Sequence, residues 1–279
     1  MTFFSSSMPP VFLMPIASLL AASLFLYSTS PLSAKEPTGA VNMQAKADSH
    51  AKQALVKKAY DLVENGNHTR NVLRKAVSLY EKNLEGAQFP PKQHLFYLID
   101  LSRAYQRFGD LVADKDEQLR LYEEGRVTAR RAQSLDATSA EAVFWDMANM
   151  ASLGRARGIA STVMHLPELF KGLRRANALD PKHLYSREIL ARVYHEVPGV
   201  MGGSDDKAIA LLEKCIVDDP FFTPCRVTLG KLYVDEDEFA KARPLLLSVL
   251  SAKKSSVPAD FRKFNIPEAK AALARMKND

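Results

Sequence analysis

A spacing of apolar and small residues recurs along the chain and limits what it can fold into. In residues 190–194 a large apolar residue is followed by a small one and then, three positions later, by Tyr, and residues 229–233 and 101–105 repeat the pattern. Apolar residues elsewhere also recur at intervals of three and four, as in residues 211–216, which is typical of one face of an α-helix. Runs of β-branched residues bounded by tight turns are missing, so we expect an all-α protein.

The helices come in pairs of similar length. Second helices carry a small residue near their start, as at Ala208 and Ala242, and two of them end in Asp-Pro, at residues 180–181 and 219–220. Proline has no N–H and cannot continue a helix, so these dipeptides mark the step from one pair to the next. The pattern predicts five helix pairs and a C-terminal capping helix. Their expected bounds are 46–87, 92–134, 139–179, 183–218 and 222–251, with the cap at 267–278.

This pattern resembles the tetratricopeptide repeat (TPR), whose 34-residue unit is two antiparallel helices. Leu229, Gly230, Tyr233, Ala242 and Leu246 fall at the spacing of that family. The resemblance implies a superhelix of about five antiparallel helix pairs, whose inner face comes from the first helix of each pair.

The chain departs from the repeat pattern at four places. Residues 111–118 are an extra segment, and the turn at residues 198–204 is unusually long. Ala137 stands where Pro is expected, and Asp146 stands where an apolar residue is expected.

Further residues resemble one branch of the repeat superfamily, the T component of tripartite ATP-independent periplasmic (TRAP) transporters. Regulators of microtubule dynamics contain related helical repeats. The residues that carry this resemblance are Tyr-Glu-Glu-Gly at 122–125, Phe-Trp at 144–145, Val-Pro-Gly at 197–199 and Gly-Gly at 202–203. The resemblance implies an exported scaffold that partners a periplasmic solute-binding protein and self-associates as a ring. Many members are lipoproteins, whereas this chain has no cysteine before Cys215 to acylate.

The first 34 residues carry no charged side chain. They contain an apolar run at 11–27 that is followed by small residues, which is typical of a secretory signal peptide. A retained N-terminal membrane anchor is the alternative, and a mitochondrial presequence would need arginines that are missing. We therefore expect a signal peptide at 1–34, a flexible linker at 35–48 and the repeat domain at 49–279, in the periplasm or cell envelope.

Charge and motifs argue against several function classes. The net charge of +6 is spread over the chain without a dense basic patch, so no nucleic-acid partner is expected. Nucleophile, cofactor and metal-ligand patterns are all missing, so we expect no catalysis, no cofactor and no metal. The glycine-rich residues 199–204 lack the phosphate-loop pattern and are interpreted as a helix-to-helix turn.

By the register of the resembled repeat, one set of side chains lines the inner face and is the candidate groove for an extended or acidic protein partner. Ordinary solvated charges are the alternative. The set consists of Phe96, Arg103, Arg107, Tyr185, Glu188, Arg192, His195 and Lys231. In the same repeat geometry Cys215 and Cys225 face each other, either as a disulfide or as two packed thiols.

The sequence thus predicts an exported helical-repeat scaffold that acts by binding a protein, with the TRAP-associated version as its specific form. A general cell-envelope assembly or structural factor is the alternative. A hydrolase on a helical scaffold is the third hypothesis and has no supporting motif.

Overall fold

The computed structural model describes residues 39–276, with side chains from residue 43 onward. The predicted signal peptide or anchor at 1–34 lies outside the described residues. None of the helices in the described part has both the length and the apolar character needed to cross a membrane.

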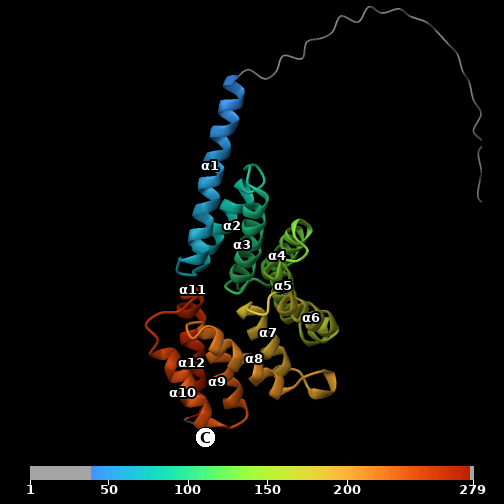
Figure 1. Cartoon of the computed structure of the whole chain (residues 1–279), viewed down its shortest axis with the longest axis vertical. Coiled ribbons are helices and arrows are strands. Elements are labelled where there is room, and N and C mark those ends of the chain that lie inside the picture. Colours follow the sequence, from blue (N-terminus) through green and yellow to red (C-terminus); the bar gives the residue numbers. More distant parts are fainter. Residues whose placement is uncertain (1–38, 277–279) are drawn as a thin grey trace, which may run out of the picture.

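Helices make up nearly all of the described residues, and Figure 1 shows them stacked from α1 at one end to α10 at the other. No strand occurs in residues 39–276. The elements are α1 (Gly39–Glu64), α2 (Arg70–Asn83), α3 (Pro91–Gly109), α4 (Lys115–Leu135), α5 (Ala140–Arg157), α6 (Ile159–Leu179), α7 (Leu184–Glu196), η1 (Gly199–Met201), α8 (Asp205–Asp218), α9 (Thr223–Asp235), α10 (Phe239–Leu250), α11 (Pro258–Asp260), η2 (Phe261–Asn265) and α12 (Ile266–Arg275).

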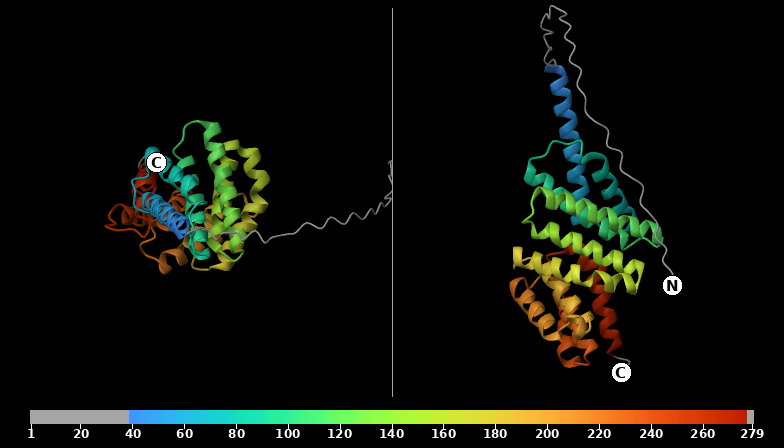
Figure 2. Two further views of the ribbon diagram at one scale, coloured as in Figure 1. Left: turned by 90° about the horizontal axis from the view of Figure 1, so that it is seen from above. Right: turned by 90° about the vertical axis from the view of Figure 1, so that its right-hand side faces the viewer.

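The predicted five helix pairs are confirmed: α1 with α2, α3 with α4, α5 with α6, α7 with α8 and α9 with α10. Each pair also packs on the next, which produces the elongated superhelix seen in Figure 2. Small residues allow the two helices of a pair to approach closely. A Cβ built on Gly230 would lie 2.7 Å from the Cδ2 atom of Leu246, so α9 and α10 touch where the repeat pattern places its small residue.

The linker predicted at 35–48 is wrong over residues 39–48, because α1 already begins at Gly39. Residues 43–48 are exposed and include Met, Gln, Ala and Lys, which are good helix formers that need no packing partner. The first buried position is Ser49, whose hydroxyl accepts a hydrogen bond from the Gln88 amide at 3.0 Å. The start of α1 therefore projects beyond the body (Figure 1).

An aspartate ends the second helix of three successive pairs. Asp136, Asp180 and Asp219 each accept, through Oδ1, a hydrogen bond at 2.8 Å from the amide two residues later. This side-chain turn reverses the chain by itself. Proline follows only two of these aspartates, and Ala137 is tolerated after the third because the aspartate makes the turn.

The unexpected Asp146 belongs to a polar layer between two apolar cores, one centred on α1–α3 and the other on α5–α10. Asp146 is buried, and its oxygens pair with Arg126 at 3.0 Å and with Arg130 at 3.1 Å. In the same layer Asn149 donates to the Ser102 hydroxyl at 3.1 Å. These partners satisfy the buried carboxylate and the Asn149 NH2 group, whereas the Asn149 Oδ1 atom has no hydrogen-bond partner among the described residues.

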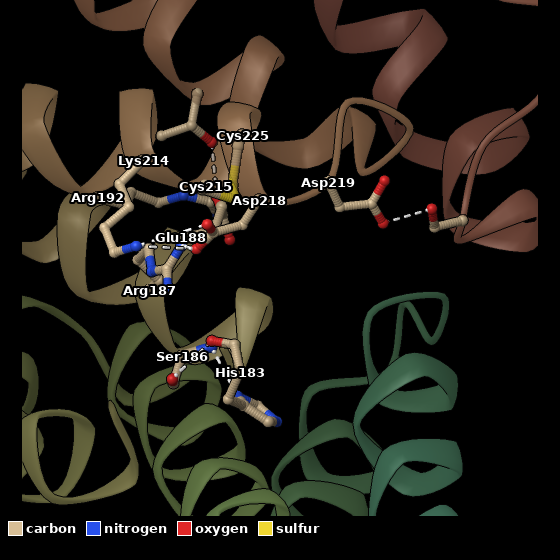
Figure 3. Close-up of a disulfide and its surroundings, with 12 residues drawn as sticks. His183, Ser186, Arg187, Glu188, Arg192, Lys214, Cys215, Asp218, Asp219 and Cys225 are labelled. Carbon is tan, nitrogen blue, oxygen red and sulfur yellow. Dashed lines mark hydrogen bonds and ion pairs between the residues drawn. A yellow bond between two sulfur atoms is a disulfide. The ribbon is translucent and has the colours of Figure 1, made fainter. Parts of the chain in front are cut away.

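Cys215 of α8 and Cys225 of α9 form a disulfide across the turn between the fourth and fifth pairs (Figure 3). Both residues are fully buried. Beside them, buried Arg187 pairs with Asp218 at 2.5 Å, so the end of α8 is also tied to α7. The disulfide thus ties α8 to α9, and the ion pair ties α8 to α7.

The C-terminal segment, residues 258–275, does more than cap the last pair as predicted. Its helix α12 packs on α9 and α10, whereas α11 and η2 turn back across the inner face and reach α1. Asp260 is buried there. It pairs with Arg107 of α3 at 2.5 Å and accepts the Tyr185 hydroxyl of α7 at 2.9 Å. One carboxylate therefore connects the C-terminal segment with two of the repeat pairs.

Replacing both cysteines by alanine (Cys215→Ala with Cys225→Ala) should lower the free energy of unfolding by about 2–3 kcal/mol, because the bond closes a short loop in the unfolded chain. Urea denaturation of oxidised wild type and the double variant measures this. Reducing the wild type should give the variant's value. Alkylation of both cysteines in unfolded, unreduced protein would contradict the bond.

Asp260→Asn should lower the free energy of unfolding by about 3 kcal/mol, because it removes the closest counter-charge of the buried Arg107 guanidinium and leaves only Asp110, at 4.0 Å. Asp61→Asn is the matched control, since it breaks an exposed pair with Lys57 and should change stability by less than about 0.5 kcal/mol. Urea denaturation compares the two. Equal effects would mean that the Asp260 pair does not hold the segment in place.

Candidate functional site

A cavity of about 580 Å³ lies between the inner helices of the superhelix and the C-terminal segment. Helices α3, α5, α6, α7 and α9 all contribute side chains to it. Its volume is in the range of sites that bind drug-sized ligands or short stretches of peptide. The cavity is therefore the candidate functional site.

One wall of the cavity is apolar and comes from α5, α6 and α7. These helices are packed by the larger apolar core, so the wall is rigidly supported. The residues that contribute to it include Phe144, Trp145, Ala148, Ala151, Leu166, Leu169, Ile189 and Val193. Apolar side chains of a ligand would gain free energy by leaving water here.

Charged side chains also line the cavity, and they are already paired. Arg192 donates to Glu188 at 2.5 Å, and Glu188 also accepts the Thr228 hydroxyl at 2.5 Å. Arg107 lies 5.7 Å from the Trp145 ring and 5.4 Å from the Phe264 ring, where each π-face attracts its charge. These groups can orient polar groups of a ligand without exposing a bare buried charge.

Tyr185 contacts both aromatic and charged side chains at the cavity. Its ring packs on Phe144 and against Phe222, and its hydroxyl donates to Asp260. Burial raises the pKa of the Tyr185 hydroxyl well above its ordinary value, and the Asp260 carboxylate raises it further. The hydroxyl therefore stays protonated and acts as a hydrogen-bond donor.

The structure brings four of the eight predicted groove residues together at this cavity: Arg107, Tyr185, Glu188 and Arg192. The other four do not line it. One of them, Arg103, reinforces the fold nearby, because it pairs with Glu64 and Asp100 and so ties α3 to α1.

The remaining three hold positions towards the ends of the stack or outside the cavity. Lys231 pairs with Glu268 of α12 at 3.1 Å, and Phe96, which is exposed, packs on the Tyr60 ring at 5.1 Å. His195 lies at the end of α7, between carboxylates of α8 and α9. The predicted groove is thus not one continuous strip.

A second, much smaller cavity of about 20 Å³ lies behind Arg107, with Arg103 and Asp260 also in its walls. His68 faces it, with Nδ1 3.6 Å from Asp260 Oδ1, and is nearly fully buried. Burial lowers the pKa of His68, although the Val63 carbonyl and the Asp260 carboxylate oppose that shift. The space is large enough for one water molecule that bridges these atoms.

Apolar side chains are exposed around one edge of the large cavity, at the start of α6 and in η1. Val163 is 44% exposed and Met201 is 40% exposed, and both line the cavity. Ile159, Met164 and Val200 are exposed nearby in the chain. We call Val163 and Met201 the apolar rim. It marks the side from which a partner can reach the cavity.

Sequence reasoning missed the contribution of the C-terminal segment, namely Asp260, Phe264, Asn265 and Glu268. Val257, Phe261 and Phe264 are spaced by four and three residues, which is a helical signal ahead of the predicted cap. That spacing indicates a helical turn before residue 267. It does not indicate which distant helices the turn contacts.

No protein-family model matches this chain, and no curated protein matches it. Among solved structures, the chain is similar to TTC0263, a thermophilic TPR protein from Thermus thermophilus, with a TM-score of 0.58 and 17% identity over 80% of this chain and 99% of that one. Two structures of MamA have TM-scores of 0.38 and 0.39, with identities of 21% and 23%. They cover 77% and 73% of this chain and 95% and 98% of their own. The likeness to TTC0263 agrees with the helix pairs described above: the chain has an all-α, TPR-like superhelical fold.

Proposed function

We propose that this protein is a non-catalytic binding protein that captures a segment of a partner protein in the large cavity. The observation that carries the proposal is the cavity itself: about 580 Å³, lined by apolar side chains and by paired charges, with an exposed apolar rim. A segment that carries both apolar side chains and polar groups would match this lining.

The site is better suited to binding than to acid–base or nucleophilic chemistry. Arg107, Arg192 and Glu188 are each engaged with a partner of opposite charge, and Tyr185 is held as a donor by Asp260. A general base or nucleophile needs a poised group that faces the reacting atom. Paired and protonated groups instead provide fixed recognition contacts.

The specific form of the proposal places the protein outside the cytoplasm as the partner of a periplasmic solute-binding protein of a TRAP-type transporter. Export is supported by the uncharged, apolar leader at 1–34. The partner class is supported by the residues that carry the family resemblance, because Phe144, Trp145, Val197 and Pro198 line the cavity. A general cell-envelope assembly factor would use the same cavity for a different partner, and self-association as a ring stays a prediction.

Two variants test the site. Ala148→Trp fills the cavity from α5, and Val163→Glu puts a charge on the apolar rim. Each should weaken capture of the partner by about tenfold or more, because Ala148→Trp occupies the space that the segment needs and Val163→Glu removes apolar contact at the rim. Affinity purification from envelope fractions, followed by quantitative mass spectrometry, measures the capture.

Ile159→Glu is the matched control on the same helix. Ile159 is 84% exposed and does not line the cavity, and an acidic residue at a helix start is well tolerated. A protein that wild type and this control enrich, and that both cavity variants lose, is the partner. Recovery of a transporter solute-binding protein supports the specific form. Equal capture by all four proteins would overturn the assignment of the cavity.

A further inference from the structure

A second cluster of side chains lies outside the cavity, where the long turn after α7 meets the end of α9. His195 of α7 has its Nδ1 2.6 Å from Asp205 Oδ1, at the first residue of α8. Its Nε2 lies 3.2 Å from Asp235 Oδ2, at the end of α9. Glu236 follows directly, and one donor atom each of His195, Asp205 and Glu236 lies within 4.8 Å of the other two.

These donors match a divalent transition-metal ion. Zinc takes imidazole nitrogen and carboxylate oxygen at about 2.0–2.2 Å, so neighbouring ligands of a tetrahedral site are about 3.3 Å apart. The donor atoms of the cluster lie within about 1.5 Å of that spacing. Glu236 is exposed, so its side chain has the freedom to adjust, while His195 and Asp205 are half-buried.

Asp235 occupies the position of an orienting partner. Nδ1 of His195 faces Asp205, and when Nδ1 is the ligand atom the opposite ring N–H points at Asp235. Metal-bound histidines usually donate their other ring N–H to a carboxylate in this way, which fixes the ring. Asp235 is in turn held by Arg275 of α12 at 2.7 Å.

The turn supports the arrangement. The Ser204 amide donates to the Tyr194 carbonyl at 2.8 Å, which holds the start of α8 against the end of α7. A Cβ on Gly203 would lie 1.6 Å from the Val197 carbonyl oxygen, so only glycine allows this approach. The predicted glycine-rich turn thus positions Asp205 beside His195.

Solvent can reach the cluster. A pocket of about 350 Å³ is lined by His195 and Asp205 together with Gly199, Gly203 and Ser204. It offers an entry path and room for a fourth ligand, such as water. Asp205, Asp235 and Glu236 gather around His195, and Arg275 pairs only with Asp235, so negative charge is in excess and attracts a cation.

We propose that His195, Asp205 and Glu236 form a binding site for one zinc-type divalent ion, with Asp235 as the orienting partner of the histidine. The ion would join α7, α8 and α9 at the edge of the turn whose Val197 and Pro198 also line the large cavity. The site does not depend on the proposed function. Sequence spacing did not indicate it, because its ligands come from three separate helices.

Isothermal titration calorimetry of EDTA-treated and desalted protein with zinc chloride tests the site. We expect one ion per chain and a zinc-dependent rise of the melting temperature. Glu236→Gln and His195→Gln should each weaken binding by at least about tenfold, and Asp235→Asn by about tenfold. The thiols do not compete, because Cys215 and Cys225 are bonded to each other.

Asp237→Asn is the matched control. Asp237 directly follows Glu236 and has a positive φ of 57°, which asparagine adopts as readily as aspartate. It should bind zinc like the wild type. The site would be overturned if the wild type did not bind zinc. It would also be overturned if Glu236→Gln and His195→Gln bound zinc as tightly as the wild type does. Glu236 is exposed, so its variant keeps the test valid if His195→Gln does not fold.

Discussion

The buried ion pair between Arg107 and Asp260 determines how the superhelix is closed. Both side chains are largely removed from water, and such a pair is stable only when its geometry is good and further hydrogen bonds satisfy it. Tyr185 supplies such a bond, and the Trp145 and Phe264 rings flank the guanidinium. Residues 258–265 must therefore lie across the inner face, and the large cavity is the space left between them and the repeat helices.

This closure changes how a repeat protein of this kind would meet a partner. An open TPR groove would present its inner face along the whole stack. Here Arg103 is occupied by Glu64 and Asp100 at one end, and Lys231 by Glu268 at the other. What remains is a partly open cavity with an apolar rim at Val163 and Met201. A partner is then expected to insert a short segment instead of lying along the groove.

The helix pairs could be predicted from sequence because their signals are local. The spacing of apolar residues within a helix and the Asp-Pro ends lie within a few residues of each other. The departures at Ala137 and Asp146 became clear only from their partners, an aspartate turn and two arginines. The start of α1 at Gly39 could not be predicted from apolar spacing, because an exposed helical turn has no buried face. It depends only on helix propensity, and the small and polar residues there were interpreted as a linker.

Local sequence signals also predicted part of the candidate site, namely four of the eight expected groove residues. Repeat register placed Arg107, Tyr185, Glu188 and Arg192 on the inner face, and they meet at the cavity. Asp260 lies 153 residues from Arg107 in sequence, and no local pattern couples the two. Such long-range packing also brings the C-terminal segment to the cavity and the carboxylates to His195.

Hydrogen exchange of the backbone amides in residues 258–275 tests the closure of the inner face most directly. Because this segment is fixed by Asp260 and by packing on α9 and α10, its amides should exchange about as slowly as those of α9 in the native protein. Exchange at the rate of an unstructured chain in residues 258–265, with α9 still protected, would show an open groove and contradict the account.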